Sequence, residues 1–198
     1  MGQRLVVSIK RNLGDEKSLC KLYYHWSGYT IPSMEETLYI INHLKSIKNI
    51  EKVSDKEIQL SLIRFCEING GGIDNSDIDY IKKLFPNESF IKKGYSRDNG
   101  LIAISDKIQK DMQNWSEGDV EIGINDRKVS FRVDWYLGQT EDEVKAEYED
   151  TNFDEVINLK YNIEECSYEQ FADIYDQLIG KEDSIFKNVD GGYYNFIY

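Results

Sequence analysis

Histidine, cysteine and proline are scarce in this sequence, which has 2 His, 3 Cys and 2 Pro among 198 residues. Cys20, Cys66 and Cys166 are far apart and include no close pair that could begin a zinc site or a disulfide framework. His25 and His43 alone cannot supply a histidine-rich metal centre. We therefore expect no metal, no cofactor and three reduced, buried thiols.

Long apolar runs are also absent. The N-terminus passes directly into a short strand-like run and never reaches the apolar length of a signal peptide or a membrane span. The nucleophile elbow, the zinc-protease helix, the dinucleotide-binding fingerprint and the kinase motifs are absent too. These absences predict a cytoplasmic protein that does not contact membranes, and they favour a function other than catalysis.

Cations are scarce in the second half of the chain. The net charge is −12; residues 1–99 contain 15 Lys+Arg and 13 Asp+Glu, whereas residues 100–198 contain 9 and 23. Binding to a phosphate backbone requires basic groups that displace its counterions, so this acidity disfavours direct contact with nucleic acid. The same charge favours attraction to a basic surface, such as the nucleic-acid groove of another protein.

The strongest charge run of the sequence opens at a helix start signal, Thr140 with Glu143, and contains one cation, Lys145. Two interpretations of this run stay open, a solvated face and a docking surface for a basic partner. In the second interpretation the partner-binding residues are Glu141, Asp142, Glu143, Glu147, Glu149, Asp150, Asp154 and Glu155.

Strand and helix signals follow one another without a regular alternation. Period-two patterns over residues 5–9 and 19–26 predict one hairpin, and residues 120–135 predict a second. Ser33 with Glu36, and Ser54 with Glu57, have the spacing of capping boxes and predict the starts of two antiparallel helices. A third short helix should end before Pro86, and we interpret the preceding aspartates as favourable charges at its N-terminus. These aspartates are Asp74, Asp77 and Asp79.

The second half has the same mixed character. Ile108, Met112 and Trp115 predict one side of a helix, and residues 156–163 predict a strand. Ser167 with Gln170 predicts the start of a last helix. We expect a single α+β domain over residues 1–198, with a mostly antiparallel sheet and helices packed on one side. A subdivision would separate a hairpin with helices, 1–95, from the acidic part, 96–198.

Aromatic side chains gather at the end of the second predicted strand, next to a glycine turn. Tyr24, His25, Trp26 and Tyr29 are candidates for a small-molecule or nucleotide site, and Gly70–Gly72 could act as its gate. The alternative for each ring is an ordinary place in the core, and for the histidine a hydrogen-bonded position at the strand end.

Two segments, LYYHWSGYT at Leu22–Thr30 and WSEG at Trp115–Gly118, resemble those of small uncharacterised accessory proteins carried by phages and mobile elements of low-GC Gram-positive bacteria. The resemblance covers short stretches and transfers no catalytic residues. It implies an accessory role. Small acidic phage proteins of that kind include anti-CRISPR and anti-restriction inhibitors, which occupy the nucleic-acid site of a host enzyme.

Three hypotheses of function follow. The first is a non-enzymatic inhibitor, in which the acidic run docks on a basic nucleic-acid-binding surface of a host protein. The second is a small-molecule or nucleotide-binding protein, or a hydrolase, with its site at the aromatic residues around His25. The third is an assembly component that self-associates through the aromatic tail, Tyr193–Tyr198. The sequence determines neither the partner nor the oligomeric state.

Overall fold

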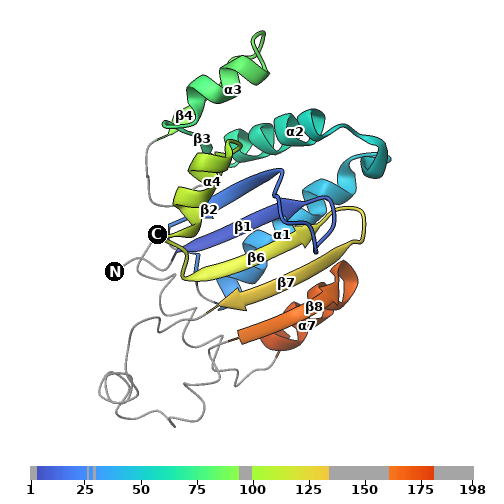
Figure 1. The fold of residues 1–198 in the computed structure, drawn as a ribbon. Coiled ribbons are helices and arrows are strands. Elements are labelled where there is room, and N and C mark those ends of the chain that lie inside the picture. The colour runs from blue at the N-terminus through green and yellow to red at the C-terminus, as the bar shows by residue number, and fades with distance from the viewer. Residues whose placement is uncertain (1–3, 26, 29, 94–99, 134–160, 181–198) are drawn as a thin grey trace, which may run out of the picture.

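The computed structural model describes residues 4–25, 27–28, 30–93, 100–133 and 161–180 of the chain. An eight-stranded sheet lies at its centre, in the order β4-β3-β5-β2-β1-β6-β7-β8 (Figure 1). The strands are β1 (Leu5–Lys10), β2 (Cys20–Tyr24), β3 (Gly72–Asp74), β4 (Lys92–Lys93), β5 (Leu101–Ala103), β6 (Gly118–Gly123), β7 (Lys128–Val133) and β8 (Tyr161–Ser167).

The sheet is mixed and mostly antiparallel. Pairs β1–β2, β2–β5, β6–β7 and β7–β8 are antiparallel, whereas β1–β6, β3–β4 and β3–β5 are parallel. Both hairpins expected from the sequence are present, as β1–β2 and β6–β7. The parallel pair β1–β6 joins strands from the two halves of the sequence into one sheet, and the α+β class is confirmed.

Three helices pack against one face of the sheet: α1 (Thr30–Ser46), α2 (Asp55–Ile68) and α7 (Tyr168–Gly180). Figure 1 shows α1 and α7 behind the strands, with the other face of the sheet towards the viewer. The strands direct every second side chain to the covered face, including Leu5, Val7 and Ile9 of β1 and Phe131 of β7. This main core is apolar and fully buried.

A single short helix, α4 (Asp106–Gln113), covers part of the opposite face. Its Ile108 and Met112 pack on Val6, Tyr23 and Leu101, which face away from the main core. Trp115, expected on the same helix face, lies beyond the end of α4 and is partly exposed, because the helix stops at Gln113. The rest of this open face, over β1, β6, β7 and β8, is polar.

Of the three expected capping boxes that fall within the described residues, two are present and one is not. Ser54 and Glu57 form both bonds of the expected capping box at the start of α2, and Ser167 with Gln170 does the same for α7. The box at Ser33 is wrong. Helix α1 already begins at Thr30, so the Ser33 hydroxyl lies inside the helix and donates instead to the Ser27 carbonyl oxygen.

The third short helix is present as α3 (Ile78–Leu84), ahead of Pro86, and a 3-10 turn η1 (Ile50–Lys52) links α1 to α2. Asp77 does more than place a charge at the start of α3. Its fully buried carboxylate accepts hydrogen bonds from the backbone amides of Ile104 and Ser105, and so fixes the start of α4.

Strand β8 runs over Tyr161–Ser167, further along the chain than the strand expected at 156–163. Residues 156–160, the expected helix from Thr140 and the aromatic tail lie outside the described residues. Among the helices that the structure describes, none combines the length and the apolar character needed to cross a bilayer.

Candidate functional site

The partner-binding residues expected at 141–155 all lie outside the described residues, so their hypothesis stays a prediction. The next described segment along the chain, residues 161–180, is acidic as well. Residues 161–180 contain five carboxylates and no Lys or Arg. The segment forms β8, the last strand in the described sheet order, and α7 beside it. The acidic character therefore extends onto one end of the sheet.

Of the four aromatic-site candidates, the structure describes Tyr24 and His25, while Trp26 and Tyr29 fall outside the described residues. Tyr24 is buried in the main core, and burial raises the pKa of its hydroxyl well above the usual value. His25 is half-buried, with its Nδ1 atom 2.8 Å from the Tyr23 hydroxyl. The small-molecule hypothesis for this stretch remains a prediction.

The glycine run proposed as a gate is a closely packed joint. Gly71 donates its amide to the Cys66 carbonyl, and Gly72 donates to the Gly100 carbonyl. A Cβ atom on Gly71 would lie 2.1 Å from the Gly100 oxygen, so only glycine fits between these two backbones. The run thus holds α2 against the sheet instead of forming an open loop.

Near Tyr24, the Glu36 carboxyl of α1 has an unusual environment. Burial, reinforced by the neighbouring Glu35 carboxylate, raises the pKa of Glu36 to about 7, against the opposing effect of a hydrogen bond with Ser27. A carboxyl of this kind is half protonated at neutral pH. It is a candidate for proton exchange, although no neighbouring nucleophile among the described residues has a lowered pKa: burial raises the pKa of the nearby Cys66 thiol as well.

The open face of the sheet contains a polar groove of about 580 Å³, the sheet groove. Strand register places Lys21, Ser8, Glu121 and Ser130 in one row across β2, β1, β6 and β7. The Ser8 side chain lies at the floor of this row, is 4% exposed, and has no hydrogen-bond partner within the described ranges.

Asp119 organises the neighbouring row of the sheet groove. Its carboxylate accepts hydrogen bonds from the Gln113 amide, the Ser116 hydroxyl and the Arg132 guanidinium. The Lys21 ammonium in turn donates to Gln113, and burial lowers the pKa of Lys21. Such a network holds its donors and acceptors in fixed positions.

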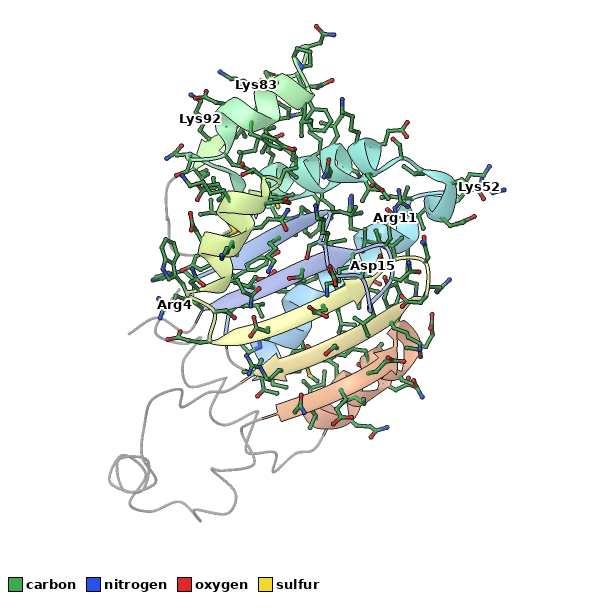
Figure 2. The ribbon with its side chains drawn as sticks, in the orientation of Figure 1. Arg4, Arg11, Asp15, Lys52, Lys83 and Lys92 are labelled. Carbon is green, nitrogen blue, oxygen red and sulfur yellow. The ribbon has the colours of Figure 1, made fainter. Side chains whose placement is uncertain are left out.

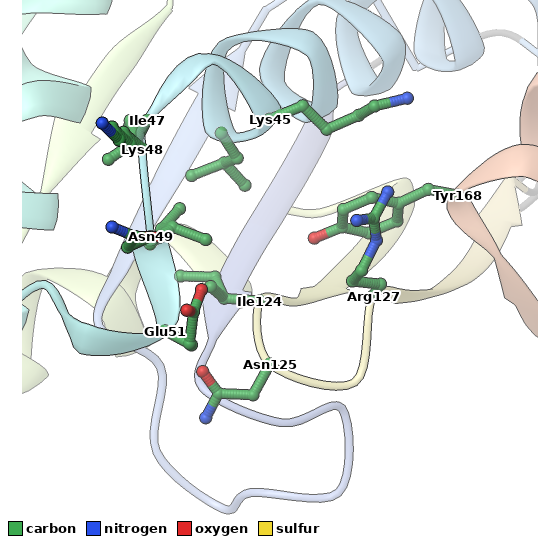
Figure 3. Close-up of a pocket in the computed structure, with 11 residues that line it drawn as sticks. Lys45, Ile47, Lys48, Asn49, Glu51, Ile124, Asn125, Arg127 and Tyr168 are labelled. Atoms are coloured by element: carbon green, nitrogen blue, oxygen red, sulfur yellow. The ribbon is translucent and has the colours of Figure 1, made fainter.

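A second cavity, of about 470 Å³, lies between the end of α1, η1, the turn between β6 and β7, and the start of α7 (Figure 3). We refer to it as the Arg127 cavity. Leu44 and Ile124 give it an apolar base, and both are buried. Three cations, Lys45, Lys48 and Arg127, and one carboxylate, Glu51, line it together with polar groups from Asn49 and Asn125.

Two of these cations converge on one carboxylate oxygen. Oε1 of Glu169 accepts a hydrogen bond from Arg127 Nη2 at 2.8 Å and lies 3.8 Å from Lys45 Nζ. The Arg127 guanidinium also lies 5.9 Å from the centre of the Tyr168 ring. Figure 3 shows these two side chains next to each other. The Tyr168 hydroxyl donates to the Gly123 carbonyl at 2.8 Å, which fixes the ring at the cavity wall.

Sequence reasoning missed both sites because each unites residues that are remote in the chain. The Arg127 cavity takes its side chains from residues 44–51, 124–127 and 168. The local signal that could have identified it is an arginine in a hairpin turn, a position where glycine or asparagine is the common choice. The position of α1 beside that turn has no local sequence signal, because the tertiary fold alone determines it.

Among the described residues, no group of three or more His, Cys, Asp and Glu side chains is placed to hold a metal ion. Comparison of the chain with family models, curated proteins and solved structures finds no match.

Proposed function

We propose that this chain is a non-enzymatic binding protein, which docks by its acidic side on a basic, nucleic-acid-binding surface of a host protein. The proposal includes the role of a phage-type inhibitor, of the anti-CRISPR or anti-restriction kind, that excludes nucleic acid from that surface. The acidic residues on which the proposal relies are those of β8 and α7 and, from the sequence alone, those at 141–155.

The observation that carries the proposal is the separation of charge between the two ends of the sheet. At the β8 end, Glu164, Asp173 and Asp176 are exposed and have no cationic partner within the described residues. At the opposite end, α3 and β4 expose Lys82, Lys83 and Lys92 beside one exposed carboxylate of α3, Asp79. Figure 2 shows Lys83 and Lys92 at the far side of the molecule from β8.

Charge separation of this kind orients a protein before contact. A basic surface attracts the β8 end and repels the α3 end, so the encounter favours one docking direction. The run at 141–155 directly precedes β8 in sequence and adds eight carboxylates to the same part of the chain. Direct binding to nucleic acid is disfavoured by the same field.

The test uses the purified chain as bait in a lysate of a low-GC Gram-positive bacterium, at low and at high salt. We expect nucleic-acid-binding proteins in the eluate, bound only at low salt and released by added duplex DNA. The substitutions Glu164→Lys, Asp173→Lys and Asp176→Lys together should abolish capture, and so should Glu143→Lys, Glu147→Lys and Glu149→Lys.

A matched control reverses three carboxylates away from the β8 end, Glu16→Lys, Asp79→Lys and Asp111→Lys, which changes the net charge by the same amount. Retention of capture by this control, with loss in the β8-end variant, supports a localised docking surface. Equal loss in both variants shows a dependence on net charge alone and contradicts the proposal. Capture that is unchanged between low and high salt contradicts it as well.

A further inference from the structure

The Arg127 cavity combines the features of a small-molecule site. Its volume of about 470 Å³ lies within the range of about 300–1,000 Å³ that is typical of ligand pockets. Its base is apolar and its rim carries three cations against one carboxylate, Glu51, in a chain whose net charge is −12. Cations gathered against the trend of the whole chain indicate a preference of this site for an anion.

Glu169 does not itself line the cavity, but it shares two of the lining cations and so shows where the anion would lie. Its carboxylate oxygen is held between Arg127 and Lys45, which come from the β6–β7 turn and from α1. The pKa of Glu169 is lowered, by a hydrogen bond with its own backbone amide and by these two cations. The cations are thus already directed at a single negatively charged group. Both ion pairs are exposed, however, and exposed pairs contribute little to stability. A ligand can therefore displace the Glu169 carboxylate at small cost.

The backbone of the cavity supports a binding role. Asn49 and Arg127 are the two non-glycine residues with positive φ in the described part of the chain, at 53° and 54°, and both line this cavity. Asparagine tolerates the left-handed region, whereas arginine disfavours it. Non-glycine residues in this region cluster at functional sites, and here the two share one cavity.

We propose that the Arg127 cavity binds a small organic anion, whose carboxylate or phosphate group replaces the Glu169 carboxylate between Arg127 and Lys45. The apolar body of the ligand lies against Leu44 and Ile124, and Lys48 adds a third positive charge to the rim. This site goes beyond the docking function proposed above and does not depend on it, because Glu164, Asp173 and Asp176 do not line the cavity.

The test is an NMR titration of the full chain with phenyl phosphate, benzoate and the neutral benzamide. We expect saturable shifts of the Ile124, Asn125 and Tyr168 amide signals with at least one anion, and at least about tenfold weaker binding of benzamide, since a charged hydrogen bond contributes about 1.5–3 kcal/mol. The stronger of the two anions identifies the preferred group. Inorganic phosphate alone tests whether the apolar body is needed.

Two substitutions should have opposite effects. Arg127→Asn suits the left-handed backbone, so the chain keeps its fold while affinity for the anion falls at least about tenfold. Glu169→Gln removes the internal competitor and should raise affinity about two- to fivefold. Matched controls outside the cavity, Arg132→Asn and Glu165→Gln, should leave the affinity unchanged.

The proposal is overturned by equal binding of benzamide and the anions, by unchanged affinity in Arg127→Asn, or by weaker anion binding in Glu169→Gln. It is also overturned if neither anion shifts the cavity signals at about 10 mM, a concentration that would nearly saturate a site with a Kd of about 1 mM. If Arg132→Asn lost as much affinity as Arg127→Asn, the loss would follow from the change in net charge. That result would also overturn the proposal.

Discussion

The two faces of the sheet differ in how they are covered, although the same strands supply both. In β6, Val120 and Ile122 face the helices and are fully buried, while Asp119 and Glu121 between them line the sheet groove. The covered face is held by apolar packing. Beyond the small apolar cluster under α4, the open face is held by hydrogen bonds and ion pairs. Stability should therefore reside on one face, and recognition chemistry on the other and at the sheet ends.

The largest effect is expected at Phe131, whose ring is fully buried on the covered face with its centre 5.5 Å from that of Phe171. Phe131→Ala should lower the free energy of unfolding by about 3–5 kcal/mol, because it removes packing between β7 and α7. Urea denaturation gives this value. Ser130→Ala, the neighbouring position on the open face, should change it by about 0.5 kcal/mol or less. Similar losses at the two positions would refute the contrast between the faces.

The next effect is a pH dependence that arises on the helix-covered side. The pKa of Glu36 rises from 4.5 to about 7 on folding, so the folded state binds more protons than the unfolded state between these values. Its contribution to stability therefore falls as pH rises through that window, by about 3 kcal/mol in total. Glu36→Gln should be more stable than the native chain at pH 8 and nearly equal to it at pH 4. Denaturation midpoints of the two proteins measured between pH 4 and pH 8 test this prediction. A stability difference that shrinks as pH rises would contradict it.

A smaller loss is expected from the hydrogen-bond network of the open face. Asp119→Ala removes the acceptor shared by Gln113, Ser116 and Arg132, and should cost about 1–3 kcal/mol, since part-buried donors lose their partner. Glu164→Gln in the same groove should have almost no effect on thermal unfolding. If Asp119→Ala were equally neutral, the network would not order the groove.

The smallest effect concerns the exposed ion pair between Lys128 and Glu165, which joins β7 to β8. Lys128→Ala should lower the unfolding free energy only slightly at low salt and by less in 1 M salt, where the Debye length is about 3 Å. Denaturation at the two salt concentrations measures the difference. A loss that does not depend on salt would assign the effect to the lysine side-chain packing instead of its charge.

Local signals in the sequence were sufficient for much of the fold. The hairpins β1–β2 and β6–β7 follow from alternation, and the starts of α2 and α7 follow from capping boxes that need only residues three apart. These features were predictable because every interaction that defines them is short in range.

Features that depend on contacts outside a local pattern were not predictable. The Ser33–Glu36 spacing looks like a capping box, but α1 already begins at Thr30, which leaves the Ser33 hydroxyl inside the helix, where it donates to the Ser27 carbonyl oxygen. Asp77 looks like a charge for α3, yet its partners are Ile104 and Ser105. The Arg127 cavity needs α1, the β6–β7 turn and α7 together. In each case the local pattern is satisfied by more than one structure, and the tertiary fold selects one.

The position of β1 at the centre of the sheet has a consequence for synthesis. One edge of β1 pairs with β2 as soon as the first hairpin has left the ribosome, whereas its other edge pairs with β6, which begins at Gly118. At roughly 5–20 residues per second, that second edge waits about 5–20 s for its partner. Throughout this interval a strand with four apolar residues among its six has open backbone groups, which is the condition under which nascent chains pair with one another. The N-terminal hairpin is therefore a segment for which a chaperone would be useful during translation.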